Sequence, residues 1–178
     1  PAEDAKRFEA LLDELERWNR KVNLTAIRDP DEMITGHLLD SLVAQPLLQG
    51  SRILDMGTGA GLPGIPLAIV RPELRVTLLD GNGKKIRFVR QVIMQLDLDQ
   101  VTAIQQRAEA HTGRYHQITA RAFSDLEELT RLASPLLEPE GEILALKGTF
   151  DTIAKETKHM VPDHVKTHRL TIPFPHDQ

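Results

Sequence analysis

The sequence predicts an α/β domain with a mostly parallel sheet and helices on both faces, and three observations lead to this prediction. Short apolar runs of strand length recur along the chain, segments with helical spacing separate most of them, and one strand runs directly into a glycine-rich loop. Alternating strands and helices form βαβ units, whose strands lie parallel and are covered on both faces. The expected strands are residues 52–56, 76–80, 101–105, 117–120 and 142–147, with a sixth near 169–172.

Helices are expected around these strands, at residues 66–70, 84–96, 126–137 and 150–160. The first 48 residues differ, because they contain no strand pattern. Phe8, Leu11, Leu12, Leu15 and Trp18 have the spacing of an amphipathic helix. Asp29-Pro30 starts a second helix, since an acidic N-cap and a proline at the first helical position are N-terminal signals, and this helix should end near Pro46. We expect one domain over residues 1–178, with residues 1–48 as a helical cap on a Rossmann-like core of residues 51–178.

The composition narrows the functional classes. Of 178 residues, 40% are hydrophobic and 27% charged, which is typical of a globular domain rather than a disordered chain. There is no cysteine and no metal-ligand spacing of histidines, so we expect no metal site. No apolar run approaches the roughly 20 residues of a membrane span, and we expect a cytoplasmic protein. A net charge of −4 argues against a non-enzymatic nucleic-acid-binding module.

The glycine-rich loop, Asp55-Met-Gly57-Thr-Gly59-Ala-Gly61-Leu-Pro-Gly64, predicts a nucleotide-like ligand. Glycines after a strand allow positive φ and let a ligand lie against the main chain. The spacing from Gly59 to Gly64 also matches a dinucleotide fingerprint, which leaves a nicotinamide-dependent dehydrogenase as an alternative. Asp55 argues against it, because a carboxylate there would repel a pyrophosphate and attract the cationic amino-acid end of S-adenosyl-L-methionine. We therefore expect a methyltransferase.

Other candidate site residues follow the later strands. Asp80 ends the second strand, where a carboxylate can accept both hydroxyls of a ribose. Arg121 and Lys147 end the fourth and fifth strands, and the carboxyl ends of parallel strands form the ligand edge of such a sheet. Both are candidates for a base or phosphate contact, and His37 is a weaker catalytic candidate that fits a capping or core role equally well. The basic run Lys84, Lys85, Arg87 and Arg90 is either a charged outer helix face or an RNA contact.

Residues 55–68 together with Leu79-Asp80 and Lys84–Phe88 resemble the glucose-inhibited division protein B family, whose members are bacterial 16S ribosomal RNA guanine-N7 methyltransferases. Further similarity lies at residues 18–25, 37–41, 121–123 and 146–148, although Gly36 stands where the family usually carries a basic residue. The resemblance implies a class I methyltransferase fold, and 16S ribosomal RNA or the small ribosomal subunit as partner. It implies cofactor contacts at Gly57, Leu62, Asp80, Gly81, Asn82, Ala108, Glu109 and Arg121, beside Asp55 and Gly59 from the loop itself.

The reaction implied by this resemblance is a direct in-line methyl transfer to guanine N7. N7 carries a lone pair and no proton, so the transfer needs no general base, and the sequence contains no acid/base motif. The cofactor motifs alone leave a small-molecule methyltransferase as the alternative, since they do not identify the methyl acceptor.

Overall fold

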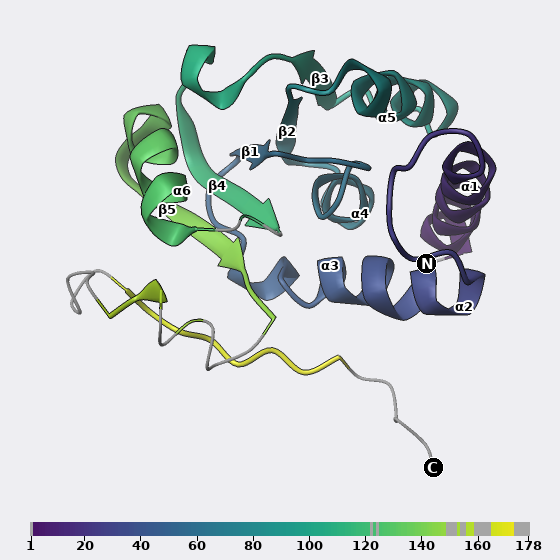
Figure 1. The fold of residues 1–178 in the computed structure, drawn as a ribbon, viewed down its shortest axis with the longest axis horizontal. Coiled ribbons are helices and arrows are strands. Elements are labelled where there is room, and N and C mark those ends of the chain that lie inside the picture. The colour runs from purple at the N-terminus through teal and green to yellow at the C-terminus, as the bar shows by residue number, and fades with distance from the viewer. Residues whose placement is uncertain are drawn as a thin grey trace.

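The computed structural model of the chain describes residues 2–121, 123, 125–148, 153, 156–158 and 165–172. Its centre is a five-stranded sheet in the order β3-β2-β1-β4-β5, in which every neighbouring pair is parallel (Figure 1). The strands are β1 (Arg52–Met56), β2 (Arg75–Asp80), β3 (Val101–Gln105), β4 (Tyr115–Arg121) and β5 (Leu137–Leu146). The chain builds the sheet outward from β1 to β3 and then returns to the other side of β1. Topological switches of this kind create ligand sites at the carboxyl ends of the strands.

Each face of the sheet has its own hydrophobic cluster, because successive side chains of a strand point to opposite faces. Ile53 and Leu78 belong to one cluster with α4 (Gly64–Val70) and α5 (Gly83–Gln95), whereas Leu54 and Leu79 belong to another with α6 (Leu126–Ala133). For this reason the apolar residues of β1 on both faces, Ile53, Leu54 and Met56, are all buried. The predicted α/β fold with helices on both faces is confirmed.

The N-terminal segment packs on the α4–α5 side (Figure 1). It comprises α1 (Ala2–Asn19), α2 (Pro30–Met33), the π-helical turn η1 (Ile34–Leu39), α3 (Asp40–Leu42) and the 3₁₀ turn η2 (Gln45–Leu47). Leu11 and Leu15 are 1% exposed in the cluster shared with α4 and α5, and the Trp18 ring meets Phe88 edge-on at 5.8 Å between centroids. Asp29 caps α2 by accepting from the Asp31 and Glu32 amides, as the sequence predicted.

Several predicted boundaries change. The predicted helix 126–137 ends at Ala133 and continues as the 3₁₀ turn η4 (Ser134–Leu136), since Pro135 cannot donate the next helical hydrogen bond. β5 begins five residues earlier than expected, at Leu137 rather than residue 142. The sixth strand predicted at 169–172 is wrong, because residues 165–172 contain neither helix nor strand. Leu170 is 39% exposed, so burial of its side chain does little to stabilise a strand there. The predicted helix 150–160 lies mostly outside the described residues.

Candidate cofactor and RNA site

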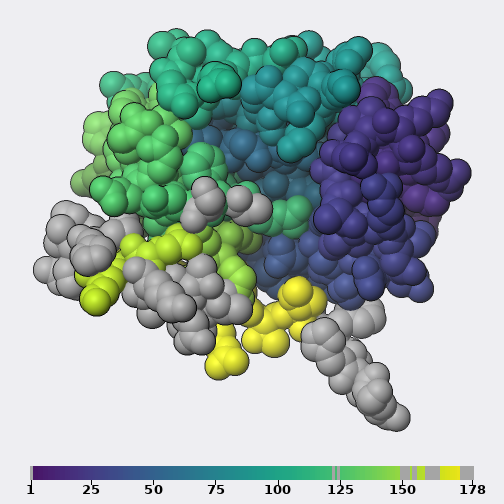
Figure 2. Space-filling view, viewed as in Figure 1, coloured from purple at the N-terminus to yellow at the C-terminus, as the bar shows by residue number. Residues whose placement is uncertain are grey.

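The predicted site residues lie at one edge of the sheet. Asp80 and Arg121 are the last residues of β2 and β4, Lys147 directly follows β5, and the glycine loop connects β1 to α4. In the space-filling view, the surface around β1 and α4 is set back between the segment that carries α5 and the segment that carries β4 and α6 (Figure 2). The parallel register brings these strand ends together although they are far apart in sequence.

The glycines of the loop fall into two pairs. At Gly61 and Gly64, an added Cβ would lie 2.3 Å from Ile65 Cδ1 and 2.2 Å from Leu78 Cδ2, so these two glycines allow the loop and helix to pack on the sheet. At Gly57 and Gly59, the nearest atoms to an added Cβ are 3.7 Å and 4.0 Å away, although both residues have positive φ (+71° and +59°). Gly57 and Gly59 therefore leave main chain uncovered at the sheet edge. An open main-chain cradle of this kind fits the expected nucleoside cofactor.

Asp55 has a different position from the one expected. Its side chain does not face the open edge but is buried beneath the loop, 1% exposed. One carboxylate oxygen accepts from the Thr58 hydroxyl at 2.6 Å and the Gly64 amide at 3.0 Å, and the other accepts from Thr119 at 3.4 Å. Burial raises the pKa of Asp55 to about 6, against the lowering effect of the hydrogen bonds from Thr58 and Gly64. Asp55 thus holds the loop in shape from behind, and its predicted attraction to the cofactor, directly or through water, stays a prediction.

Asp80 lies where a ribose-binding acid was predicted, beside the open pair of glycines. Its two oxygens accept from the Gly59 amide at 2.9 Å and the Asn82 amide at 2.7 Å. The carboxylate thereby orients the loop, and each oxygen retains a second lone pair for a hydroxyl. Asn82 caps α5, because its side-chain oxygen accepts from the Lys84 amide at 2.9 Å and the Lys85 amide at 3.4 Å. Gly81 and Asn82 are exposed at this edge.

The remaining predicted cofactor residues offer backbone more than side chain. Ala108 is partly buried and Glu109 exposed in the 3₁₀ turn η3 (Ala108–Ala110), directly beyond β3. Leu62, within the loop, is 4% exposed and its side chain belongs to the core, so a cofactor contact there would involve its main chain. These contacts stay predictions.

Arg121 connects the sheet to the N-terminal cap. Its guanidinium donates to the Gly36 carbonyl at 3.2 Å and to Asp40 at 3.1 Å, and its other terminal nitrogen lies 3.4 Å from His37 Nδ1. The side chain is only 19% exposed. Gly36, the departure from the family pattern, contributes its carbonyl to this tether, and a Cβ there would lie 2.7 Å from Ile27 Cδ1. Arg121 is therefore held by protein groups, and its contact with cofactor or substrate stays a prediction.

His37 is a core histidine rather than a solvent-facing acid or base. It is 5% exposed, and its Nε2 lies 2.7 Å from the Thr25 hydroxyl. Burial, and then the nearby charge of Arg121, lower the pKa of His37. Both ring nitrogens lie within hydrogen-bond distance of protein groups, Nε2 of Thr25 and Nδ1 of Gly36 and Arg121, which fits a core role. The catalytic role of His37 stays a prediction.

Lys147 is also buried, contrary to the exposed rim position that was predicted. Its side chain is 8% exposed, forms an ion pair with Glu156 at 2.8 Å and donates to the Phe123 carbonyl at 2.5 Å. A phosphate contact would require breaking this pair. Lys147 instead holds Phe123, whose ring borders Gly57, 3.7 Å from where a Cβ would lie.

Two neighbours of the open glycines were not predicted to border the cofactor. The Phe123 ring lies beside Gly57, and the Lys85 ammonium lies 4.0 Å from where a Cβ of Gly59 would be. Both residues lie within the stretches that resemble the family, and this similarity was the only sequence feature that could have pointed to them. Within the described part of the chain, no three metal-ligating side chains gather at one point, and no helix has the length and apolar character needed to cross a membrane.

Comparisons with known proteins agree with this geometry. The family model GidB, described as rRNA small subunit methyltransferase G, matches residues 4–178. A Chromohalobacter salexigens protein named ribosomal RNA small subunit methyltransferase G is 48% identical over 173 residues, covering 97% of this chain and 82% of the relative. A protein of the same name from Stenotrophomonas maltophilia is 53% identical over 146 residues, covering 81% and 68%.

A solved structure supports the fold independently. Coclaurine N-methyltransferase, bound to N-methylheliamine and SAH, aligns with a TM-score of 0.56 at 18% identity over 76% of this chain and 43% of that one. At this identity the likeness concerns the fold alone. It confirms the predicted class I methyltransferase architecture.

Proposed function

This chain belongs to the GidB family of rRNA small subunit methyltransferases, and from that premise we propose that it methylates N7 of a guanine in 16S ribosomal RNA. Methyl transfer to small-subunit ribosomal RNA with S-adenosyl-L-methionine as donor is the activity of this family, and the predicted enzyme class and cofactor are thereby confirmed. The observation that carries the proposal is the open cradle of Gly57 and Gly59 beside Asp80 in a chain of this family.

The residues present fit the cofactor. Gly57 and Gly59 would take its main-chain contacts, Asp80 would accept the ribose hydroxyls, and the turn at Ala108 and Glu109 would border the adenine. When bound, S-adenosyl-L-methionine supplies a methyl group on a positively charged sulfur. Asp55 supports this site from beneath, through its hydrogen bond to the Gly64 amide.

The protein's contribution to the reaction is positioning. Guanine N7 presents a lone pair and no proton, so no side chain needs to act as a base. This agrees with a His37 that is buried, with both ring nitrogens within hydrogen-bond distance of protein groups. Holding a nucleophile in line with the group it attacks is worth about 7–11 kcal/mol in ideal cases. Phe123, held by Lys147, and the cap segment, held by Arg121, are the groups beside the cradle that would fix the base.

The substrate form and location are part of the proposal. The acceptor is 16S ribosomal RNA, free or within the small ribosomal subunit, and the enzyme is cytoplasmic because that is where such particles assemble. The small-molecule alternative receives no support from coclaurine N-methyltransferase, which resembles this chain in fold only.

Labelled methyl transfer tests the function. The protein is incubated with labelled cofactor and either unmodified 16S ribosomal RNA or small subunits, and the modified base is identified by mass spectrometry. We expect label in 7-methylguanine, with activity falling steeply as salt increases, because RNA phosphates release counterions on binding. Label in another base would refute the N7 assignment, and a flat salt response with a small neutral acceptor would favour the alternative.

A further inference from the structure

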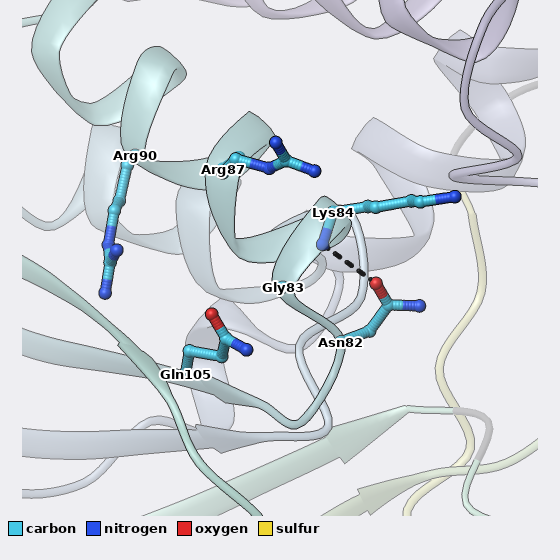
Figure 3. Close-up of a pocket in the computed structure, with 6 residues that line it drawn as sticks. All are labelled: Asn82, Gly83, Lys84, Arg87, Arg90 and Gln105. Carbon is cyan, nitrogen blue, oxygen red and sulfur yellow. Dashed lines mark hydrogen bonds between the residues drawn. The ribbon is translucent and has the colours of Figure 1, made fainter.

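A groove of about 580 Å³ follows α5 next to the cofactor edge. It is lined by residues of the α5 N-terminus, the outer face of that helix and the end of β3: Asn82, Gly83, Lys84, Arg87, Arg90 and Gln105 (Figure 3). Asn82 follows Asp80 by two residues and belongs to the predicted cofactor set as well. The groove, here called the α5 groove, therefore shares Asn82 with the proposed active site.

The side chains that line the α5 groove are suited to an anion. Three carry a positive charge, two are amides, and no carboxylate lines the groove. The Asn82 oxygen is occupied by the α5 cap, so its amide nitrogen is the free end of that side chain. Arg90 is fixed in place, because its guanidinium donates to the Ala103 carbonyl at 3.2 Å. The groove thus presents hydrogen-bond donors with little acceptor capacity.

The cations of the α5 groove are unneutralised. Among the residues that the structure describes, Lys84, Arg87 and Arg90 form no ion pair, and the thirteen residues of α5 include no acid in a chain of net charge −4. By contrast, these basic residues are each paired with a carboxylate: Arg17, Arg20, Arg52, Arg71, Arg121, Arg131 and Lys147. Unpaired cations gathered along one helix are the electrostatic pattern of a phosphate-binding surface.

We propose that the α5 groove binds the phosphate backbone of the RNA strand that carries the methylated base. The proposal rests on the proposed function, in which that strand is the substrate. Lys84 and Arg90 are six residues apart, about 9 Å along the helix axis, so the row of charges can contact successive phosphates. Because phosphate contacts position a nucleic acid without reading its sequence, the groove would set where the strand lies while the cradle edge receives the base.

The test compares two charge reversals. Arg87→Glu places an acid in the groove, and Arg75→Glu makes the same change at an exposed arginine at the start of β2, the opposite edge of the sheet. Binding of a single-stranded 16S ribosomal RNA fragment is measured at several salt concentrations, with calorimetry of the cofactor as a folding control. We expect Arg87→Glu to weaken RNA binding about five- to tenfold and to flatten its logarithmic salt slope by about 0.7–1, with cofactor affinity retained. Arg75→Glu should match the wild type.

The outcomes separate this proposal from the function on which it rests. If the wild type methylates RNA but Arg87→Glu and Arg75→Glu bind RNA equally, the α5 groove proposal is wrong and the function stands. If the wild type transfers no methyl to RNA, the function itself fails. Binding of an acidic peptide can be measured with the same two variants. If Arg87→Glu abolishes peptide binding and leaves RNA affinity unchanged, the surface belongs to a protein partner and the proposal is wrong.

Discussion

Two sets of basic residues lie near the same edge of the sheet, and they are used in opposite ways. Arg121 and Lys147 are partly buried, with side chains 19% and 8% exposed, and each is paired with a carboxylate and donates to a backbone carbonyl. Lys84 and Arg87 on α5 are exposed and unpaired among the described residues. The first pair fits the task of holding the cap and the Phe123 loop in place, and the second fits the task of attracting an anion.

This difference shows that a strand-end position does not by itself assign a role. Their strand-end positions make Arg121 and Lys147 candidates for a base or phosphate contact, whereas the sequence leaves the α5 cations as either a charged outer face or an RNA contact. Arg121 pairs with Asp40, which is distant in sequence. Lys147 pairs with Glu156, which lies in the segment after β5. Removing one partner of a desolvated ion pair lowers the stability of the fold, because the other charge is left without a partner. Exposed charges instead attract ligands of opposite charge through the electrostatic potential at the surface.

The largest effect is expected for Arg121→Ala. Removing the guanidinium leaves the Gly36 carbonyl and Asp40 without their partner and detaches the cap from β4. We expect a loss of about 2–4 kcal/mol in the free energy of unfolding, below the range for a fully buried pair because Asp40 is 39% exposed. Chemical denaturation measures it, and Arg75→Ala, an exposed control, should change stability by under about 0.5 kcal/mol. Equal effects of the two would show that Arg121 is not a tether.

Asp55 gives a pH test of burial at the same edge. Its folded pKa of about 6 lies above the ordinary 3.8, so the folded protein holds a proton that the unfolded chain releases. This contribution to stability is complete below pH 4 and is lost as the pH rises through 6, on the order of 2–3 kcal/mol in total. Asp55→Asn should lack that dependence. Parallel stability profiles of the two proteins between pH 4 and 7 would contradict the burial of the charge.

Asp80 is the partly exposed counterpart of Asp55 at the cofactor edge. Asp80→Ala should weaken binding of S-adenosyl-L-methionine by about 1.5–3 kcal/mol, the range for hydrogen bonds to a charged group. Part of this loss comes through the Gly59 amide, which Asp80 holds at 2.9 Å. Calorimetry measures the affinity, and circular dichroism checks that the variant folds. Unchanged affinity in a folded variant would remove Asp80 from the site.

Lys147→Met should have the smallest effect on RNA binding. It tests most directly the difference between the paired cations and the unpaired cations of α5. Because Lys147 is paired with Glu156, its loss should lower methyl transfer through a displaced Phe123 while the salt slope of RNA binding stays that of the wild type. Arg87→Gln is the matched variant, since it removes one charge from the α5 groove and should flatten the slope. A flattened slope in Lys147→Met would return Lys147 to the role of a phosphate contact.

Most of the fold was predictable, because strands buried on both faces and amphipathic helices leave local patterns. β1 and β3 were predicted at their observed bounds, and the class of sheet followed from the alternation of strands and helices. The wrong strand at 169–172 had an apolar pattern, but Leu170 is 39% exposed there. Hydrophobic periodicity indicates which secondary structure a segment is able to form, whereas the burial that stabilises this structure depends on the segments that pack against it.

The candidate site divides in the same way. By themselves, the residues Asp55 to Gly64 and Asp80 determined a glycine loop after one strand and an acid at the end of the next, because glycine's access to positive φ and the apolar pattern of a strand are local properties. Only the tertiary structure decided that Asp55 lies beneath the loop, that His37 is enclosed, and that Arg121 is paired while Arg87 is not. The role of an ionisable side chain depends on its exposure and its partners, and both come from segments that only the folded chain brings together.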